Sequence, residues 1–232
     1  MGFGVKETVT MYFNLHRPES ELLLGGNESY RNREYYQCPI TTEHLDGSRR
    51  VGSLAVKLEH NRRDELMIWC RVEGLAIHEH LLAEFEQQGF TGYRTKPATV
   101  SFRDGSISSE YREFVVTGWA GIAQPDSGVS VKISCPACHW KTYTGVKNYE
   151  KLIDWNQWTG EDFFIVWPLP RFVLVTERVA MWLLGREVKS FCLRGLDDPD
   201  QSVGTSGFTV GRLSNFLPED LAITYGRPLG LE

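Results

Sequence analysis

The tetrapeptide Cys135-Pro136-Ala137-Cys138 is the feature that most restricts how this chain can fold. Two cysteines at this spacing can direct both thiolates from one tight turn at a single ion, which is how half of a tetrahedral zinc site is commonly built. The other three cysteines, Cys38, Cys70 and Cys192, stand alone in the sequence, and the total of five is odd. This pattern excludes the disulfide framework of a small secreted protein.

A tetrahedral site needs two further ligands. His139 follows the pair directly, so the backbone would have to fold sharply for its ring to reach the same ion. Cys38 and His44, which are separated by a short loop, are therefore the first choice. The predicted metal ligands are Cys38, His44, Cys135 and Cys138, and the expected cofactor is structural zinc. In the alternative without metal, Cys38 is a buried small hydrophobic residue and the pair is a reduced turn.

A redox role for the pair is less favoured by its surroundings. Thioredoxin-like sites place the two cysteines at the start of a helix that follows a strand. Residues 129–134 are strand-like, but residues 139–144 contain three aromatic rings and two threonines. This composition does not favour a helix after the pair.

The composition of the 232 residues is that of a globular protein. Hydrophobic residues make up 41% and aromatic residues 12%, which suffices to build a core. The net charge of −5 does not favour nucleic acid or an anionic membrane as a partner. No apolar run approaches a signal-peptide core or a membrane span, so a cytoplasmic location is expected. We expect one domain over residues 1–232, with 1–134 and 135–232 as candidate sub-modules.

The hydrophobic pattern predicts an α+β fold with mixed or antiparallel sheets and a few short helices. Strands are expected at residues 5–15, 54–58, 66–70, 98–102, 172–176 and 188–193, with 54–58 and 66–70 forming a hairpin and 19–34 a polar loop. Helices are expected at residues 75–85, stopped by Gly89, and at 177–184, stopped by Gly185, with a weak one near 217–223. The repeated order of helix, glycine and strand suggests two similar αβ modules joined by a zinc-knuckle-like turn.

Signatures of catalysis are missing from the sequence. There is no GxSxG elbow, phosphate-binding GxxxxGK[ST] loop or HExxH helix, so an enzyme is disfavoured. His78 and His80 are two residues apart, which points their rings in different directions on a helix and predicts a solvated face. The run Arg49-Arg50 and the charged segment 62–65 are interpreted as solvated loops. Trp155, Trp158 and Trp167 could anchor a partner or fill the core.

Several sequence blocks resemble the bacterial double-CXXCG motif family, whose members are immunity proteins of polymorphic toxin systems. The blocks are YQCP (36–39), LLAEFEQQGFTGY (81–93), SCPACHW (134–140) and DFFIVWPLPRFVLVTERVAMWLLG (162–185), and the likeness covers roughly residues 30–200. Two positions depart from the family pattern. Thr41 stands where the first motif has its second cysteine, and His139 stands where the second motif has glycine.

The resemblance implies a non-catalytic cytoplasmic protein that binds a cognate toxin and blocks it by steric occlusion. It also implies a four-cysteine metal site, in which His44 or another residue would have to replace the missing thiolate. The acidic net charge would suit a basic toxin such as a nuclease. Two other hypotheses stay open from the sequence: a zinc-stabilised regulatory or nucleic-acid-binding adaptor with a local basic face, and a thiol enzyme that uses Cys135 or Cys138.

Overall fold

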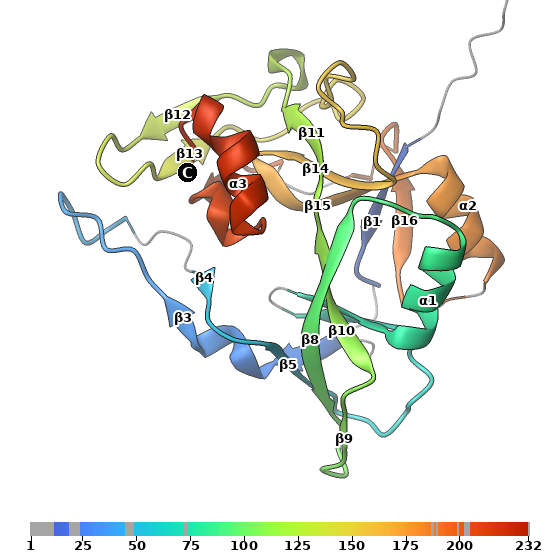
Figure 1. The fold of residues 1–232 in the computed structure, drawn as a ribbon. Coiled ribbons are helices and arrows are strands. Elements are labelled where there is room, and N and C mark those ends of the chain that lie inside the picture. The colour runs from blue at the N-terminus through green and yellow to red at the C-terminus, as the bar shows by residue number, and fades with distance from the viewer. Residues whose placement is uncertain are drawn as a thin grey trace, which may run out of the picture.

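The computed structural model describes residues 12–18, 24–44, 49–71, 74–186, 188, 190–198, 200–201 and 205–231. Within these residues the chain has an α+β fold with mixed and antiparallel sheets, which confirms the predicted fold class (Figure 1). The helices of this described part are short, namely α1 (Glu79–Gln87), α2 (Glu177–Gly185) and α3 (Glu219–Gly226). None of them combines the length and the apolar character needed to cross a membrane.

The largest sheet closes on itself. Its strands in spatial order are β10 (Tyr111–Val116), β7 (Leu75–His78), β6 (Met67–Cys70), β2 (Leu24–Asn27), β5 (Leu54–Lys57), β8 (Tyr93–Ser101) and β9 (Ile107–Ser108). Strand β10 pairs with β8 as well as with β7, so Arg112 and Glu113 have a neighbouring strand on both sides. Side chains from these strands form one apolar core, which includes Val56, Ile68 and Tyr111.

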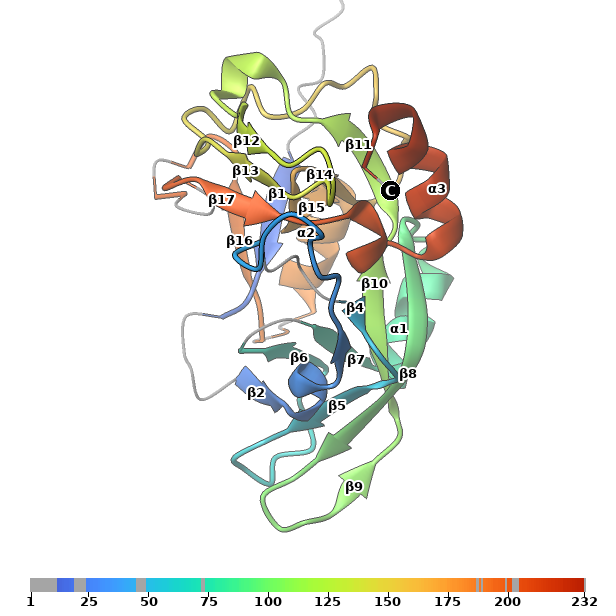
Figure 2. The same cartoon turned by 90° about the vertical axis from the view of Figure 1, so that its left-hand side faces the viewer.

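The second sheet combines strands from the two ends of the chain. Its order is β11 (Gly118–Ile122), β14 (Phe163–Trp167), β15 (Leu169–Thr176), β1 (Tyr12–His16) and β16 (Cys192–Gly195). Strand β1 is antiparallel to both β15 and β16, and Figure 2 shows it among strands of the C-terminal half. Asn14 is buried and its Nδ2 donates a hydrogen bond to the Val173 carbonyl at 3.0 Å. The sheet therefore takes strands from both candidate sub-modules, 1–134 and 135–232.

Two smaller sheets carry the sequence blocks of interest. Strands β12 (Val131–Ser134), β13 (Lys141–Tyr143) and β17 (Phe208–Val210) form one, and β3 (Arg33–Glu34) and β4 (Arg49–Arg50) form the other. Residues 28–44 form a segment that we call the arm. It starts with the 3-10 helix η2 (Glu28–Arg31) and includes β3. Figures 1 and 2 both show the arm reaching the hairpin of β12 and β13.

The predicted hairpin of residues 54–58 and 66–70 is wrong, although both strands exist as β5 and β6. Strand β2 lies between them, antiparallel to β5 and parallel to β6. The sequence pattern assigned β2 to a polar loop because it contains Gly25 and Gly26. A Cβ on Gly25 would lie 2.3 Å from Cγ1 of Val56, so this strand fits only because glycine lacks a side chain.

The predicted helix at 75–85 begins later than expected. Residues 75–78 are strand β7, and α1 starts at Glu79 after His78, whose ring accepts a hydrogen bond from the amide of His80. Gly89, with φ of 64°, ends this helix as predicted. Strand 172–176 and helix 177–184 match β15 and α2, whereas the strand expected at 188–193 lies at β16. Residues 5–11 of the first predicted strand lie outside the described residues.

Arg50 is not in the solvated loop that the sequence predicted. It belongs to β4 and forms an ion pair with Glu113 of the closed sheet, and the two side chains are only 12% and 10% exposed. Trp167 is fully buried, Trp158 is half-buried and Trp155 is exposed, so the three tryptophans divide between core and surface.

Candidate metal centre

Two loops that are far apart in the sequence meet at the end of the arm. One follows β3 and contains Cys38 and His44, and the other is the turn between β12 and β13 that contains Cys135 and Cys138. The ligand atoms of these four residues all lie within 4.8 Å of one another. The Sγ atoms of Cys38 and Cys135 are 3.8 Å apart, and Cys138 Sγ lies 3.6 Å from His44 Nδ1. All four predicted ligands are thus together, as in a possible metal site.

The hairpin turn holds Cys135 and Cys138 in a knuckle. The amide of Cys135 donates to the carbonyl of Trp140 at 2.9 Å, and the amide of His139 donates to the carbonyl of Cys135 at 3.0 Å. The amides of Cys138 and Ala137 point at Cys135 Sγ and together lower the pKa of this thiol, although burial opposes them. The pair lies in the turn of a β-hairpin. As the sequence predicted, a strand precedes it and it is not at the start of a helix.

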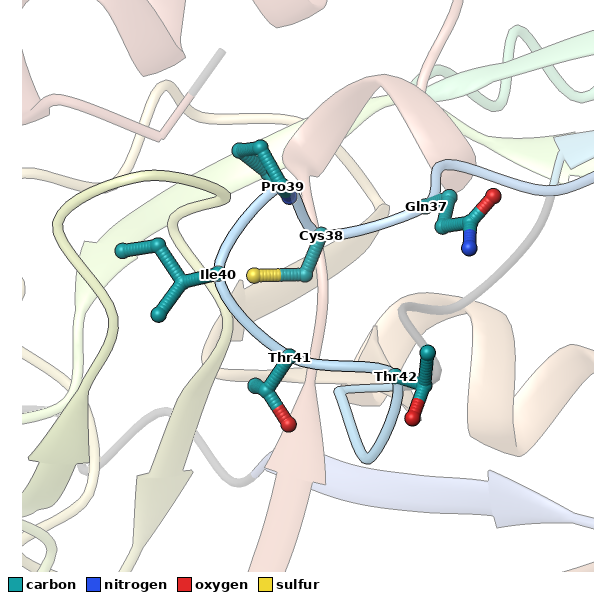
Figure 3. Close-up of a pocket in the computed structure, with 6 residues that line it drawn as sticks. All are labelled: Gln37, Cys38, Pro39, Ile40, Thr41 and Thr42. Atoms are coloured by element: carbon teal, nitrogen blue, oxygen red, sulfur yellow. The ribbon is translucent and has the colours of Figure 1, made fainter.

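The loop with Cys38 repeats this arrangement. Burial raises the pKa of Cys38, but the amides of Ile40 and Thr41 and the ring of His44 outweigh burial and lower the pKa to about 6. These amides belong to the second and third residues after the cysteine, the same positions as Ala137 and Cys138 after Cys135. Figure 3 shows the loop curling round the Cys38 sulfur, with the side chain of Ile40 pointing away from it. Position 41 in this loop therefore corresponds to position 138 in the other.

His44 is oriented by an aromatic contact. Its ring stacks on Trp140, with centroids 4.3 Å apart and an interplanar angle of 9°. A hydrogen bond with Cys38 raises the pKa of His44, and Cys135 adds to this effect. Burial, together with the neighbouring thiols of Cys135 and Cys38, raises the pKa of Cys138 to about 11. Two of the three sulfur atoms, those of Cys38 and Cys135, thus have a lowered pKa, beside a His44 ring whose pKa is raised.

The three sulfur atoms are shielded from solvent. Cys38 and Cys135 are each 5% exposed and Cys138 is 0% exposed, and they form a small cluster of their own with Ala137 and Trp140 packed against it. All three are free thiols rather than disulfides. A buried group of three soft ligands and one imidazole suits a thiophilic ion.

Two residues that departed from the motif pattern lie beside the group but outside it. Thr41 accepts a hydrogen bond from the amide of Glu43 at 3.2 Å through its Oγ1. His139 is exposed and is not among the grouped ligands. Its φ of 60° is the positive value that glycine adopts most easily, and it is the one non-glycine residue with positive φ in the described chain. The structure therefore explains why glycine would be favoured at position 139.

Sequence reasoning missed the residues that support the ligands. Trp140 was noted only as an aromatic residue, and the amides of Ile40 and Thr41 leave no sequence signal. The repeated Cys-Pro step at 38–39 and 135–136 was the one available indication that the two loops share a shape. Cys70 and Cys192 are not part of the group.

His78 and His80 form no metal group with neighbouring carboxylates within the described residues. His80 lies near Glu84 on the exposed face of α1, and His78 serves as the N-cap of this helix. A scan against protein-family models and a search of curated proteins both find no match for this chain.

Proposed function

We propose that this protein is a non-catalytic immunity protein that binds a cognate bacterial toxin and blocks it by covering the toxin's active site. In this proposal, one structural zinc ion holds the binding surface in shape. The observation that carries the proposal is the meeting of Cys38 with Cys135 and Cys138, because these residues belong to the two sequence blocks that resemble the double-CXXCG family. Cys38 and Cys135 are 97 positions apart in the chain, yet their sulfur atoms lie 3.8 Å apart.

The spacing of the ligand atoms supports zinc as the ion. In a tetrahedral site with Zn–S of about 2.3 Å and Zn–N of about 2.0–2.1 Å, two sulfur ligands are about 3.8 Å apart and a sulfur and a nitrogen ligand are about 3.6 Å apart. The distances of 3.8 Å from Cys38 to Cys135 and 3.6 Å from Cys138 to His44 fit both values. Three thiolates and a neutral imidazole would leave one negative charge on the zinc site, which the amide donors of the two knuckles would partly offset.

A zinc ion with four protein ligands has no open position for substrate or water, so its role here is structural. The group joins the arm to the β12–β13 hairpin. Few apolar contacts would hold the end of the arm without it, since the local cluster consists of three cysteines with Ala137 and Trp140. Metal binding would therefore fix the arm's position on the rest of the protein.

The toxin hypothesis is tested with the product of the gene beside this one. Expression of that product alone should stop the growth of a bacterial host, and co-expression of this protein should restore it. A stoichiometric complex should form between the purified proteins at micromolar concentration or below, and one equivalent should abolish toxin activity. If the two proteins do not bind at micromolar concentration, the proposal is wrong.

The metal is tested by elemental analysis of purified protein, with one zinc per chain as the expected result. His44→Ala should lose the zinc. The double variant Thr41→Cys/His44→Ala should regain it, because position 41 has the same place in its knuckle as Cys138 in the other. Zinc content unchanged in His44→Ala would remove His44 from the ligand set.

A further inference from the structure

A cationic cleft separates the closed sheet from the five-stranded sheet and η4 (Leu213–Asn215). It has a volume of about 630 Å³ and lies beside the start of the arm. Its walls include β10 and β15, and its rim includes β3 and β4. Six cationic side chains line it in addition to the internally paired Arg50: Arg17, Arg33, Arg49, Arg71, Lys96 and Arg171.

The lining is strongly unbalanced in charge. The described residues of the lining include two carboxylates, Glu219 and Glu113, of which Glu113 is paired with Arg50. Arg49, Arg71 and Lys96 are exposed, and none of the three has a carboxylate partner within the described part of the chain. The whole chain has a net charge of −5, so positive charge is concentrated here and the remaining surface is correspondingly more acidic. A cleft lined by one sign of charge focuses its field on an oppositely charged ligand.

The arm beside the cleft exposes large side chains that usually lie in protein interfaces. Tyr30, Tyr35, Tyr36 and Ile40 are 41%, 66%, 39% and 68% exposed. Tyrosine and arginine are the residues most enriched, with tryptophan, at the energetic centres of protein–protein interfaces. The arm supplies the tyrosines and, from its strand β3, Arg33 at the rim, and the paired strand β4 supplies Arg49.

The ring faces of these tyrosines favour a polypeptide over nucleic acid as the ligand. The guanidinium of Arg33 lies 5.1 Å from the centroid of the Tyr30 ring, and that of Arg212 lies 4.2 Å from the Tyr36 ring. One face of the Tyr30 ring and one face of the Tyr36 ring are thus covered, which reduces the aromatic surface on which the bases of a single strand could stack. The cleft also has apolar walls from Leu75, Phe114 and Val173, which suit an amphipathic peptide segment.

We propose that the cationic cleft and the arm form the surface that binds the toxin, and that the toxin enters the cleft with an acidic segment of its chain. This inference rests on the proposed function and specifies the chemistry of the partner. It also reverses the expectation of a basic partner that the net charge gave. Net charge governs the field at long range, whereas the groups in contact decide which surface binds.

The test measures toxin binding by charge-matched variants. Arg49→Glu/Lys96→Glu reverses two cations of the cleft, and Lys132→Glu/Lys151→Glu reverses two exposed lysines outside it, so both variants lower the net charge equally. With catalytically inactivated toxin in a calorimetric titration, we expect the cleft variant to weaken binding by at least about 100-fold and the control by less than about 3-fold. Circular dichroism and zinc content check that each variant is folded. If Arg49→Glu/Lys96→Glu unfolds, Arg49→Gln/Lys96→Gln takes its place.

An equal loss of toxin affinity in the cleft variant and the control would overturn the inference and leave the proposed function intact. Failure of the unmodified protein to bind the toxin would overturn the proposed function. A second experiment needs no toxin. Fluorescence anisotropy should show that poly-L-glutamate binds the unmodified protein and not the cleft variant. Tighter binding of a 12-nucleotide oligo(dT) than of poly-L-glutamate, also lost in the cleft variant, would assign the cleft to nucleic acid and overturn the inference.

Discussion

The candidate metal centre and the ion-pair network around Asp162 solve the same problem in different ways. Each joins loops that are distant in the sequence, and each has a buried charged group at its centre. Asp162 is 6% exposed and accepts hydrogen bonds from the amide of Thr91 at 3.0 Å and from the hydroxyl of Thr176 at 3.0 Å, and Arg178 forms an ion pair with it. Arg178 also donates to the carbonyls of Gln88 and Gly89, at the end of α1.

The difference lies in what completes each junction. The Asp162 network is satisfied by groups of the chain itself, and it adjoins a large aromatic core in which Phe85 contacts Phe163 and Trp182. The sulfur cluster has a much smaller apolar surrounding, in which Ala137 and Trp140 pack against the three cysteines. In the function proposed above an ion completes the metal centre, whereas the Asp162 network needs none, and the following variants separate the two junctions in order of expected effect.

The largest effect is expected from Cys138→Ser at the fully buried ligand. This variant should lose the metal and lower the free energy of unfolding by on the order of 4 kcal/mol, a fraction of the roughly 10–16 kcal/mol with which zinc binds zinc-finger peptides. Urea denaturation with and without a chelator measures it. Cys192→Ser, at a free cysteine outside the group, is the matched control and should keep the chelator sensitivity of the unmodified protein. A chelator without effect on the unmodified protein would rule out a structural metal.

The next effect is expected from Asp162→Ala, which leaves Thr91, Thr176 and Arg178 without their shared acceptor. We expect a loss of about 2–3 kcal/mol, since the carboxylate is buried but the Arg178 side chain is half-exposed and can turn to water. Unlike the loss in Cys138→Ser, this one should be the same with and without chelator. Zinc content that falls together with stability would show that the two junctions are coupled.

A smaller effect concerns pH. Burial raises the pKa of Asp162, but Arg178, the Thr91 amide and the Thr176 hydroxyl outweigh it and hold the pKa below its ordinary value of 3.8. A carboxyl group with a lowered folded-state pKa stabilises the fold above its unfolded pKa and loses this contribution as the pH falls through the folded value. The difference in unfolding free energy between the unmodified protein and Asp162→Asn should therefore be constant near pH 6 and shrink below about pH 4. A constant difference down to pH 2 would contradict this.

The smallest effect is a gain in stability from His139→Gly. The positive φ of His139 costs a residue with a side chain about 1–2 kcal/mol, and glycine recovers this less its own conformational entropy, which leaves about 0.5–1 kcal/mol. Thermal unfolding measures the gain. The same substitution at exposed His80, within helix α1, should instead destabilise the protein by about 0.3–0.5 kcal/mol. Equal signs at the two positions would show that backbone strain at residue 139 is unimportant.

The metal group could be predicted because its signal is local. The spacing of Cys135 and Cys138 indicates a knuckle by itself, and the Cys-Pro step at 38–39 marks the second loop. The choice of His44 over His139 followed from how far a backbone can turn. The aromatic support from Trp140 could not be found in this way, because stacking depends on where two loops meet.

The sheets were predictable only as individual strands. Strand β2 was missed because Gly25 and Gly26 suggest a loop, whereas the crowding of Val56 and Ile68 around Gly25 requires glycine within the sheet. The cationic cleft was missed for another reason. Its arginines and lysine come from separate elements. Only Arg49 and Arg50 are adjacent in the sequence, and the sequence analysis assigned that run to a solvated loop.

The position of β1 in the second sheet has a consequence for how the protein is made. Asn14 bonds to Val173, 159 residues later, and both strands beside β1 come from residues 169–195. At about 5–20 residues per second, a ribosome needs roughly 10 to 30 s to supply these partners. During that interval the first strand of the chain has no sheet to join. The nascent chain therefore forms the sheet around β1 only after residues 169–195 have emerged.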